Sequence, residues 1–407
     1  MKKRYNVTLA IFVGLALGVI NGLWILPNIS GVVPAIDLIT SLYMSALKMM
    51  IFPLVFCSLI VGIKGIGSAS ATGKVGGQSL LYFIATTLFA SLLGLFLPKA
   101  LGFGKDVFID LAAQADAGVE AMPFSGLLDT VKSLIPSNPI ASFANGDMLQ
   151  VLVFALIVGI ACLVLGKKAD PFVNVCESLN DICVKIVEWV MYTTPIGVFC
   201  SISSVCYSNG VATIASLGKV LLALYITYIV YGIVIYGGLV KLVGKVSPLT
   251  FFKKIMPATL NAFGTCSSSA TLPISKKCAD DLNVPNEISS FALPLGATIN
   301  MDGVSILMSF MIVYFANACG IEVSLGMMII VLLSNTLLSI GTPGVPGGAI
   351  AAFAALATIA GLPVEIMAIY VSVNTLCDMG ATCINVLGDL ACSVAMSRTC
   401  RLQKKEN

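Results

Sequence analysis

The sequence predicts an all-α integral membrane protein in which eight transmembrane helices are combined with two re-entrant helical hairpins. Its 407 residues are 58% hydrophobic and only 11% charged, whereas charged residues make up about 25% of a typical soluble domain. Uncharged windows such as 5–36, 75–98 and 189–218 reach the roughly 20 apolar residues that a spanning helix needs. Two further uncharged windows are interrupted by serine, glycine or proline, and these predict the hairpins.

The expected helices follow the uncharged windows. The first window is too long for the apolar region of a secretion signal and lacks a convincing cleavage site, so we expect it to remain as a span. The eight helices are predicted at residues 7–27, 38–64, 77–99, 143–166, 172–207, 216–244, 287–318 and 364–397, with broken segments at 251–280 and 322–360.

The placement of basic residues predicts the orientation in the membrane. Lys2, Lys3 and Arg4 favour a cytoplasmic amino terminus by the positive-inside rule. Alternating crossings put the other basic clusters on the same side and the acidic 100–147 loop outside. We therefore expect a multi-pass protein of the plasma membrane with both termini in the cytoplasm.

The window 255–275 predicts the inner hairpin. Lysine pairs flank both of its ends, at 253–254 and 276–277, and a full crossing would leave one pair outside. Three consecutive serines, 267–269, favour local hydrogen bonds over a helix interior. A hairpin that enters and leaves from the cytoplasm fits both observations.

The window 323–364 is about twice the length of one span and contains a Gly/Pro run at 341–348 that cannot continue a helix. The segment could form two full spans or one hairpin that enters from outside. Either alternative returns the chain to the same side of the membrane, so the topology of the last helix is unchanged. The hairpin is favoured because two spans would leave a cytoplasmic loop without a basic residue. Paired interrupted segments predict a binding site between them.

Three carboxylates lie in apolar sequence without a basic partner. Residues 278–397 contain no Lys, Arg or His, yet they include Asp302, Asp378 and Asp389. Anions inside a bilayer are costly and commonly mark an ion or substrate pathway. The counter-charge is therefore expected to arrive from outside as a metal cation, a proton or a cationic ligand group, which indicates a transporter.

Polar side chains accompany these carboxylates. Asn300 and Asp302, with glycines nearby, suit an unwound helix whose oxygen atoms bind a hard cation. Thr86 and Thr87 offer hydroxyl groups, although by themselves they are typical helix-packing residues. On the last helix one face carries Asn374, Asp378, Ala381, Thr382, Asn385 and Asp389. The thirteen cysteines, without a C-x-x-C pair or any histidine, predict core packing rather than a zinc site.

Five runs resemble the dicarboxylate/amino-acid:cation symporter family, which includes glutamate transporters, neutral amino-acid exchangers and serine/threonine symporters. In order they are LKMMIFPLVF (47–56), SSSATLP (267–273), PLGATINMDG (294–303), GTPGVPG (341–347) and DMGATCINVLGD (378–389). The resemblance implies inverted repeats, a homotrimer in the lipid bilayer and a transport domain that moves like an elevator past a static scaffold. Nucleic acid is not an expected partner.

The same resemblance divides the chain. Scaffold helices are expected at 1–75 and 143–210, and an extracellular loop region at 101–142. The transport domain would comprise 76–100 and 211–400, including both hairpins, followed by a cytoplasmic tail at 401–407.

The resemblance also implies which residues bind sodium, which would be co-transported rather than kept as a permanent cofactor. Three sites are implied: Gly296, Asn300, Asn385 and Asp389; Thr298, Ser339, Ile340 and Thr342; and Phe83, Thr86, Thr87, Asn300 and Asp302.

For the substrate, the resemblance implies an α-carboxylate contact with Ser267, Ser268 and Asn385, and an ammonium contact with Asp378 and Thr382. The remaining expected pocket residues are Met301 and Ala381, with Val345 and Ala349 in the outer-hairpin lid.

Departures from the acidic-substrate pattern predict a neutral cargo. Ala381 stands where those members carry an arginine, and Cys266 where some archaeal members carry one. Val304 and Asn374 replace the usual threonine and aspartate. A second substrate carboxylate here would be a buried, unpaired anion, which costs several kcal/mol. We expect sodium-coupled symport or exchange of serine, threonine or alanine; acidic amino acids or C4-dicarboxylates, and proton coupling, remain alternatives.

Two other classes are considered. Gly388-Asp389 resembles part of an intramembrane aspartyl protease motif, but Asp378 and Asp389 would lie about 16 Å apart on one helix. Histidine, the commonest general base, is absent. A channel would need a filter repeated around an oligomer axis. An enzyme is therefore not expected.

Overall fold

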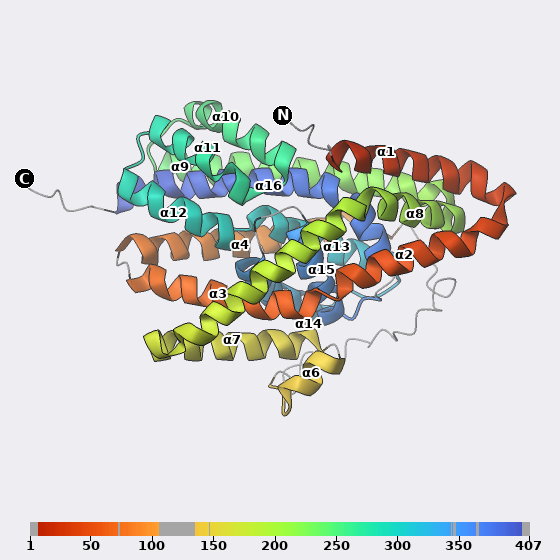
Figure 1. The fold of residues 1–407 in the computed structure, drawn as a ribbon. Helices are drawn as coiled ribbons and strands as arrows, with labels where there is room; N and C mark the ends of the chain where they lie inside the picture. The colour runs from red at the N-terminus through yellow and green to blue at the C-terminus, as the bar shows by residue number, and fades with distance from the viewer. Residues whose placement is uncertain are drawn as a thin grey trace, which may run out of the picture.

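The computed structural model describes residues 7–71, 74–105, 135–145, 147–342, 344, 347–363 and 366–400. All regular secondary structure in these ranges is helical, as the sequence predicts (Figure 1). The helices are α1 (Val7–Ile20), α2 (Val33–Lys48), α3 (Ile51–Ala71), α4 (Lys74–Leu101), α6 (Pro139–Asn145), α7 (Met148–Leu165), α8 (Asp170–Tyr231), α9 (Gly237–Leu242), α10 (Pro248–Thr265), α11 (Ser268–Asp281), α12 (Asn286–Ile299), α13 (Asp302–Ala318), α14 (Leu325–Gly341), α15 (Gly348–Ile359) and α16 (Ile366–Thr399).

Parts of the predicted topology lie outside the described residues. These are the basic amino-terminal residues, residues 106–134 of the expected outer loop and the tail at 401–407. The orientation of the termini therefore stays a prediction.

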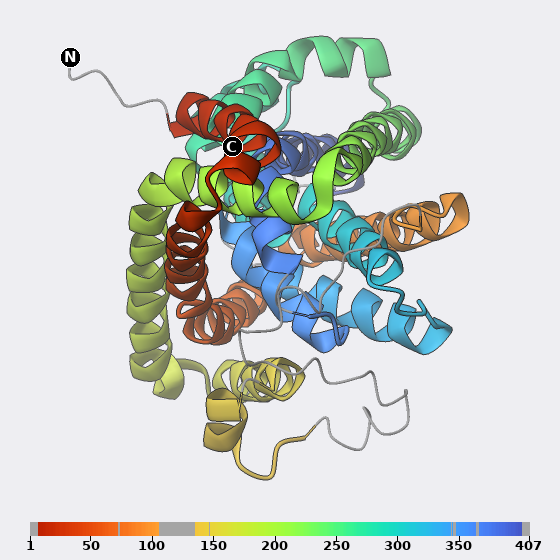
Figure 2. The same ribbon diagram turned by 90° about the vertical axis from the view of Figure 1, so that its right-hand side faces the viewer.

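The carboxyl-terminal helices form the centre of the bundle. The apolar windows within Asn286–Ala318 and Ile369–Thr399 are 100% buried. Figure 2 shows these blue and cyan segments in the middle, with the earlier helices around them. Among the described residues, five helices are long and apolar enough to cross a membrane, and five shorter apolar helices accompany them. The chain is therefore an all-helical, multi-pass membrane protein.

One predicted helix, 38–64, is wrong as a single element. The chain forms α2 and α3 with a break at Met49–Met50. Pro53 lies in the first turn of α3, where its missing N–H is tolerated, but in a continuous helix its ring would clash with the carbonyl group of Met49. The predicted helix 143–166 likewise divides into α6 and α7.

The predicted separation of 172–207 from 216–244 is also wrong. The backbone stays helical through Ser208-Asn209-Gly210, and α8 extends over 62 residues before the π-helical turn η6 (Gly232–Tyr236) and α9. Figure 2 shows that this long helical run changes direction. Helical hydrogen bonding satisfies backbone polar groups that a loop would leave exposed to lipid.

The first helix packs closely on α8. Gly14, Gly18 and Gly22 face backbone atoms of α8, and a Cβ atom at Gly14 would lie 2.4 Å from the carbonyl oxygen of Pro195. Small residues at four-residue spacing allow membrane helices to approach this closely. The amino-terminal span is therefore fixed against α8.

Both interrupted segments form pairs of short helices. Cys266, with a left-handed φ of 48°, separates α10 from α11. Helices α14 and α15 have 17 and 12 residues, or about 25 and 18 Å at 1.5 Å per residue. Each is shorter than the hydrocarbon core of about 30 Å. These lengths favour a hairpin over two full spans.

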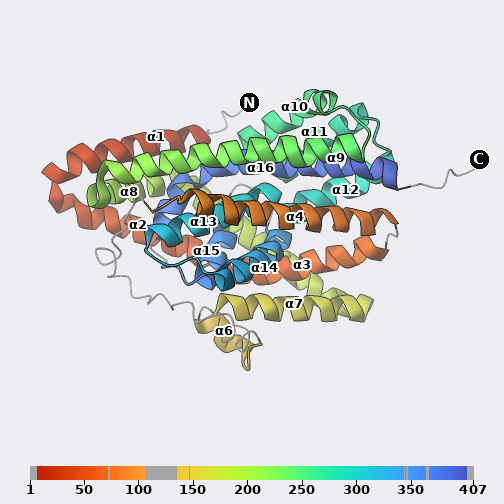
Figure 3. The same ribbon diagram turned by 180° about the vertical axis from the view of Figure 1, so that it is seen from behind.

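The two pairs enter the bundle at opposite ends. Gly244, just before α10, packs on Val394 near the carboxyl end of α16, and that end of α16 bonds to the start of α4. At the other end of α4, the Lys99 ammonium donates to the carbonyl oxygen of Val323, just before α14, at 2.8 Å. Figure 3 shows α4 running along the bundle between these ends. The hairpin tips therefore point toward each other.

Candidate cation and substrate site

The hairpin tips meet inside the bundle. The Ser267 hydroxyl donates to the carbonyl oxygen of Gly344 at 2.8 Å, and the backbone N–H of Ser269 donates to the same oxygen at 3.2 Å. Ser267 also caps α11, because its hydroxyl oxygen accepts from the N–H of Ala270 at 3.1 Å. The amino-terminal end of α11 therefore faces the meeting point of the tips.

A second irregular backbone segment lies next to this point. As the sequence predicts, the helical run is unwound at Asn300 and Met301, between α12 and α13. The N–H of Gly303 donates to Asn385 Oδ1 on α16 at 2.8 Å. A Cβ atom at Gly303 would lie 2.0 Å from the carbonyl oxygen of Ala381. Glycine is needed there because α13 begins directly against the backbone of α16.

The first predicted sodium group comes together in the structure. Asn300 Nδ2 donates to Asp389 Oδ1 at 3.0 Å and lies 3.5 Å from the carbonyl oxygen of Asn385. A Cβ atom on Gly296 would lie 2.3 Å from Asp389 Oδ1. Gly296 and Asn300 thus lie against the buried carboxylate of Asp389, and Asn300 also links it to the backbone of Asn385.

The third predicted group also comes together, around Asp302. The Thr87 hydroxyl donates to Asp302 Oδ1 at 2.7 Å. The Thr86 hydroxyl lies 3.2 Å from the carbonyl oxygen of Phe83 and 3.4 Å from Asn300 Oδ1. Asn300 is shared by the two groups, so the Asp302 and Asp389 sites are neighbours.

Sequence reasoning missed two residues at Asp302. The hydroxyl groups of Tyr231 and Tyr236 both donate to Asp302 Oδ2, at 3.1 and 2.5 Å. Their spacing of five residues places them on different faces of a regular α-helix. Sequence periodicity therefore carried no signal for this pair.

The second predicted group is not assembled in this structure. The Thr298 side chain is exposed, and its hydroxyl donates to the carbonyl oxygen of Leu295 in its own helix at 2.8 Å. The hydroxyls of Ser339 and Thr342 also bond within α14. Within the described ranges, no hydrogen bond joins Thr298 to Ser339, Ile340 or Thr342.

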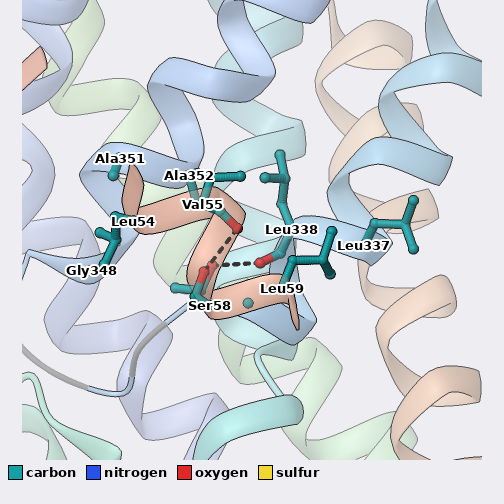
Figure 4. Close-up of a pocket in the computed structure, with 11 residues that line it drawn as sticks. Leu54, Val55, Ser58, Leu59, Leu337, Leu338, Gly348, Ala351 and Ala352 are labelled. Atoms are coloured by element: carbon teal, nitrogen blue, oxygen red, sulfur yellow. Dashed lines mark hydrogen bonds between the residues drawn. The ribbon is translucent and has the colours of Figure 1, made fainter. Parts of the chain in front are cut away.

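The end of α14 instead packs on α3. A Cβ atom on Gly62 would lie 2.9 Å from the carbonyl oxygen of Ile340. Figure 4 shows the small cavity that remains here, lined by Ser58, Leu338 and Gly348 among others. Its volume of about 10 Å³ has room for about one water molecule.

The predicted substrate residues lie along one face of α16 and at the hairpin tips. Thr382 donates to Asp378 Oδ1 at 3.3 Å. Asn385 Nδ2 lies 3.2 Å from the sulfur of Met301. Val345 lies outside the described residues. The remaining predicted pocket residues, Ser267, Ser268, Ala349 and Ala381, are buried.

Two polar atoms on the same face of α16 have no hydrogen-bond partner among the described residues. These are the Tyr370 hydroxyl and Asn374 Oδ1, about two turns and one turn before Asp378, respectively. Both side chains are at most 1% exposed. Buried polar groups are nearly always satisfied, so an unpaired cluster needs an occupant or another explanation.

The charges and donors of the site fit a hard cation. Among the described residues, none of Asp302, Asp378 and Asp389 is in an ion pair. Apart from Asn300 Nδ2, the polar atoms described around Asp302 and Asp389 are carboxylate, amide, hydroxyl and carbonyl oxygens, which suit hard cations rather than soft metals. A helical membrane bundle with such a site between two hairpins defines a transporter that couples a cation to a small solute.

Comparison with known proteins assigns this transporter to a family. The model of the sodium:dicarboxylate symporter family matches residues 7–399. The chain belongs to the sodium:dicarboxylate symporter family.

Similar proteins carry different cargo names. The chain is 32% identical over 397 residues to neutral amino acid transporter B(0) of Mus musculus, covering 86% of this chain and 71% of that protein. It is 30% identical over 404 residues to the proton/sodium-glutamate symport protein of Bacillus subtilis, with 97% and 93% covered. It is 29% identical over 400 residues to C4-dicarboxylate transport protein 2 of Pseudomonas aeruginosa, with 96% and 90% covered.

These matches confirm the predicted family and activity class. The protein is a cation-coupled symporter of amino acids or dicarboxylates, and it is not an enzyme. The intramembrane protease alternative is therefore excluded. Relatives at about 30% identity do not choose between neutral and acidic cargo or between sodium and proton.

Proposed function

We propose that this protein uses a sodium gradient to move a small neutral amino acid, such as serine, threonine or alanine, by symport or exchange. The observation that carries the neutral cargo is the complete absence of basic residues from 278 to 397. Ala381, one turn from Asp378, offers nothing to balance a second carboxylate. An acidic substrate would bury an anion without a partner, which costs several kcal/mol.

The hairpin tips and α16 provide the contacts that every α-amino acid needs. Asp378 would take the ammonium group, with Thr382 holding one of its oxygens. Ser267, Ser268 and Asn385 would take the α-carboxylate. The amino-terminal end of α11 favours this arrangement, because unpaired N–H groups and the helix dipole attract anions there.

The unpaired atoms of Tyr370 and Asn374 support a substrate that carries a hydroxyl group. Both lie on the α16 face that carries Asp378. A serine or threonine hydroxyl can donate to Asn374 Oδ1 and accept from Tyr370, whereas alanine cannot. Serine and threonine are therefore the preferred candidates.

The cation sites follow the two groups that are already assembled. We propose one sodium ion at Gly296, Asn300, Asn385 and Asp389, and one at Phe83, Thr86, Thr87, Asn300 and Asp302. A third, at Thr298, Ser339, Ile340 and Thr342, requires the end of α14 to leave its contact with Gly62 of α3. Closure of the outer hairpin would then complete both the third ion site and the substrate pocket.

The wider organisation is also proposed rather than observed. It comprises eight spans, two of which lie within the long helical run of α8 and α9, and two re-entrant hairpins with inverted repeats. A scaffold of residues 1–75 and 143–210 would carry a mobile transport domain of 76–100 and 211–400, and α8 would join the two parts. Both termini would be cytoplasmic and the assembly a homotrimer in the plasma membrane. Cross-linking of the purified protein in membranes tests the trimer.

A binding screen tests the proposed cargo and ion together. The purified protein is titrated with each of the twenty amino acids and with C4-dicarboxylates, in sodium or in choline medium. We expect serine, threonine or alanine to bind only in sodium. Binding of aspartate, glutamate or a C4-dicarboxylate instead would establish the acidic alternative. Equal binding in choline, potassium or lithium would reject sodium coupling.

A further inference from the structure

A π-helical turn lies beside the Asp302 carboxylate. The turn η6 (Gly232–Tyr236) interrupts the helical run between α8 and α9. In a regular α-helix, residues five apart point about 140° away from each other. The i→i+5 hydrogen bonds of a π-helix instead bring such residues close to one line. Tyr231 and Tyr236 accordingly lie together, with ring centroids 5.2 Å apart and ring planes at 88°.

The two tyrosines act on the same oxygen atom. Tyr236 donates to Asp302 Oδ2 at 2.5 Å and Tyr231 at 3.1 Å, whereas Thr87 donates to Oδ1 at 2.7 Å. All these side chains are buried. The Asp302 carboxylate is therefore held with Oδ2 against the tyrosines and Oδ1 against Thr87 of α4.

The two tyrosine hydroxyl groups differ in their hydrogen-bond acceptors. The single hydroxyl proton of Tyr231 has two acceptors, because the carbonyl oxygen of Thr86 lies only 2.7 Å away. For Tyr236, Asp302 Oδ2 is the nearest hydrogen-bonded atom. Tyr236 is thus the main donor to Oδ2, because the nearer acceptor of the Tyr231 hydroxyl is the carbonyl oxygen of Thr86.

Helix α16 leaves space for this arrangement at Gly388. A Cβ atom there would lie 2.4 Å from the Tyr236 hydroxyl oxygen and 2.6 Å from Asn300 Nδ2. The hydroxyl that holds Asp302 and the amide that holds Asp389 therefore both occupy the space that a side chain at this glycine would fill.

We propose that Tyr236, assisted by Tyr231, is a positioning residue for the coupled cation. The π-helical turn sets the orientation of Asp302, so that Oδ1 faces the oxygen atoms of Thr86, Thr87 and Asn300 before the cation arrives. Preorganisation lowers the ordering cost of binding. This inference rests on the proposed cation site at Asp302 and adds the residues that orient it.

The test measures cation binding without transport. The unfolding temperature of the purified protein is followed against sodium concentration, with choline replacing sodium to keep ionic strength constant. In the wild type we expect a saturable rise. Hydrogen bonds to charged groups are among the stronger ones, so Tyr236→Phe should raise the half-saturating sodium concentration about tenfold. Tyr231→Phe should raise it by a smaller factor, because its proton is shared.

A matched control removes a tyrosine hydroxyl elsewhere. Tyr43 is buried, and its hydroxyl is hydrogen-bonded to the Thr194 hydroxyl at 3.0 Å, away from the carboxylates. Tyr43→Phe should lower the unfolding temperature in choline while leaving the half-saturating sodium concentration unchanged. This control separates loss of stability from loss of cation affinity.

The outcomes separate this inference from the proposed function. A wild type without sodium-dependent stabilisation would reject the cation site itself. A wild type that responds, together with a Tyr236→Phe protein of unchanged half-saturating concentration, would leave the site standing and overturn the positioning role. Should Tyr236→Phe fail to fold, Tyr231→Phe carries the test, and an unchanged half-saturating concentration there would overturn the positioning role of the tyrosine pair.

Discussion

The Ser267 hydroxyl donates a 2.8 Å hydrogen bond to the carbonyl oxygen of Gly344, joining the tips of two hairpins that are 77 residues apart in the chain. Ser267 is also the residue proposed to bind the substrate carboxylate. The hydroxyl has one proton, so it cannot donate fully to both partners. Substrate entry should therefore release Gly344 and move the outer tip relative to the inner one.

Replacing Ser267 tests this shared role. Ser267→Ala should weaken amino-acid binding about tenfold at saturating sodium, because a hydrogen bond to a charged group is lost. Loss of the α11 cap should also lower the free energy of unfolding by about 1 kcal/mol. Titration calorimetry and thermal unfolding measure the two effects.

Ser269→Ala is the matched control, because Ser269 reaches Gly344 through its backbone N–H and keeps that bond. Its affinity should stay near that of the wild type. Equal losses in the two variants would contradict the assignment of the Ser267 side chain.

Removing the negative charge at Asp389 or Asp302 should weaken sodium binding. Asp389→Asn and Asp302→Asn keep the side-chain size but remove the negative charge at each ion group. We expect the half-saturating sodium concentration to rise at least tenfold, or coupling to be lost, because the neutral amide lacks the negative charge that attracts the ion. Sodium-dependent uptake into liposomes measures this.

A surface aspartate controls for general effects of charge. Asp280→Asn changes a residue whose side chain is 59% exposed at the end of the inner hairpin. It should leave the sodium requirement unchanged. A comparable sodium requirement in Asp389→Asn and in Asp280→Asn would remove Asp389 from the cation site.

Replacing Asp378 should weaken amino-acid binding while leaving sodium binding largely intact. Asp378→Ala leaves the substrate ammonium without its charged partner, which costs about 2 kcal/mol or more. We expect the amino-acid affinity to fall about 30-fold or more, while sodium-dependent stabilisation without substrate persists. Uptake affinity that is untouched in this variant would show that the ammonium contact lies elsewhere.

Ala381→Arg should change the preferred cargo. An arginine at this position would supply the positive charge that residues 278–397 lack, and it can pair with a second substrate carboxylate. We expect aspartate or glutamate to become effective competitors, while serine and threonine lose affinity. A competition panel measures the change.

Ala381→Met provides the size control, because it adds a long side chain without charge. It should weaken neutral substrates without admitting acidic ones. If Ala381→Arg leaves the competition panel in the wild-type order, the predicted pocket around Ala381 is incorrect.

The local breaks in the bundle were predictable from the sequence. The helices end or begin where expected at three places: at Cys266–Ser267, beside the serine run, at the Gly/Pro run after Ile340, and at the Asn300–Met301 pair. These residue types carry their own preference against a continuing helix, so no distant contact is needed to recognise them. Helix continuity was harder: the break before Pro53 and the unbroken α8 both differ from the predicted boundaries.

The sequence alone determined that this is a membrane transporter with buried anions and no internal counter-charge, because the cost of burying a charge depends on composition and not on a particular packing. Only the tertiary structure decided which neutral groups surround each anion. Asn300 lies between the Asp302 and Asp389 groups because α12 and α13 unwind against α16. Tyr231 and Tyr236 reach Asp302 because one π-helical turn changes the direction of a side chain. Hydrogen bonds require the positions of atoms on separate helices, and packing alone sets these positions.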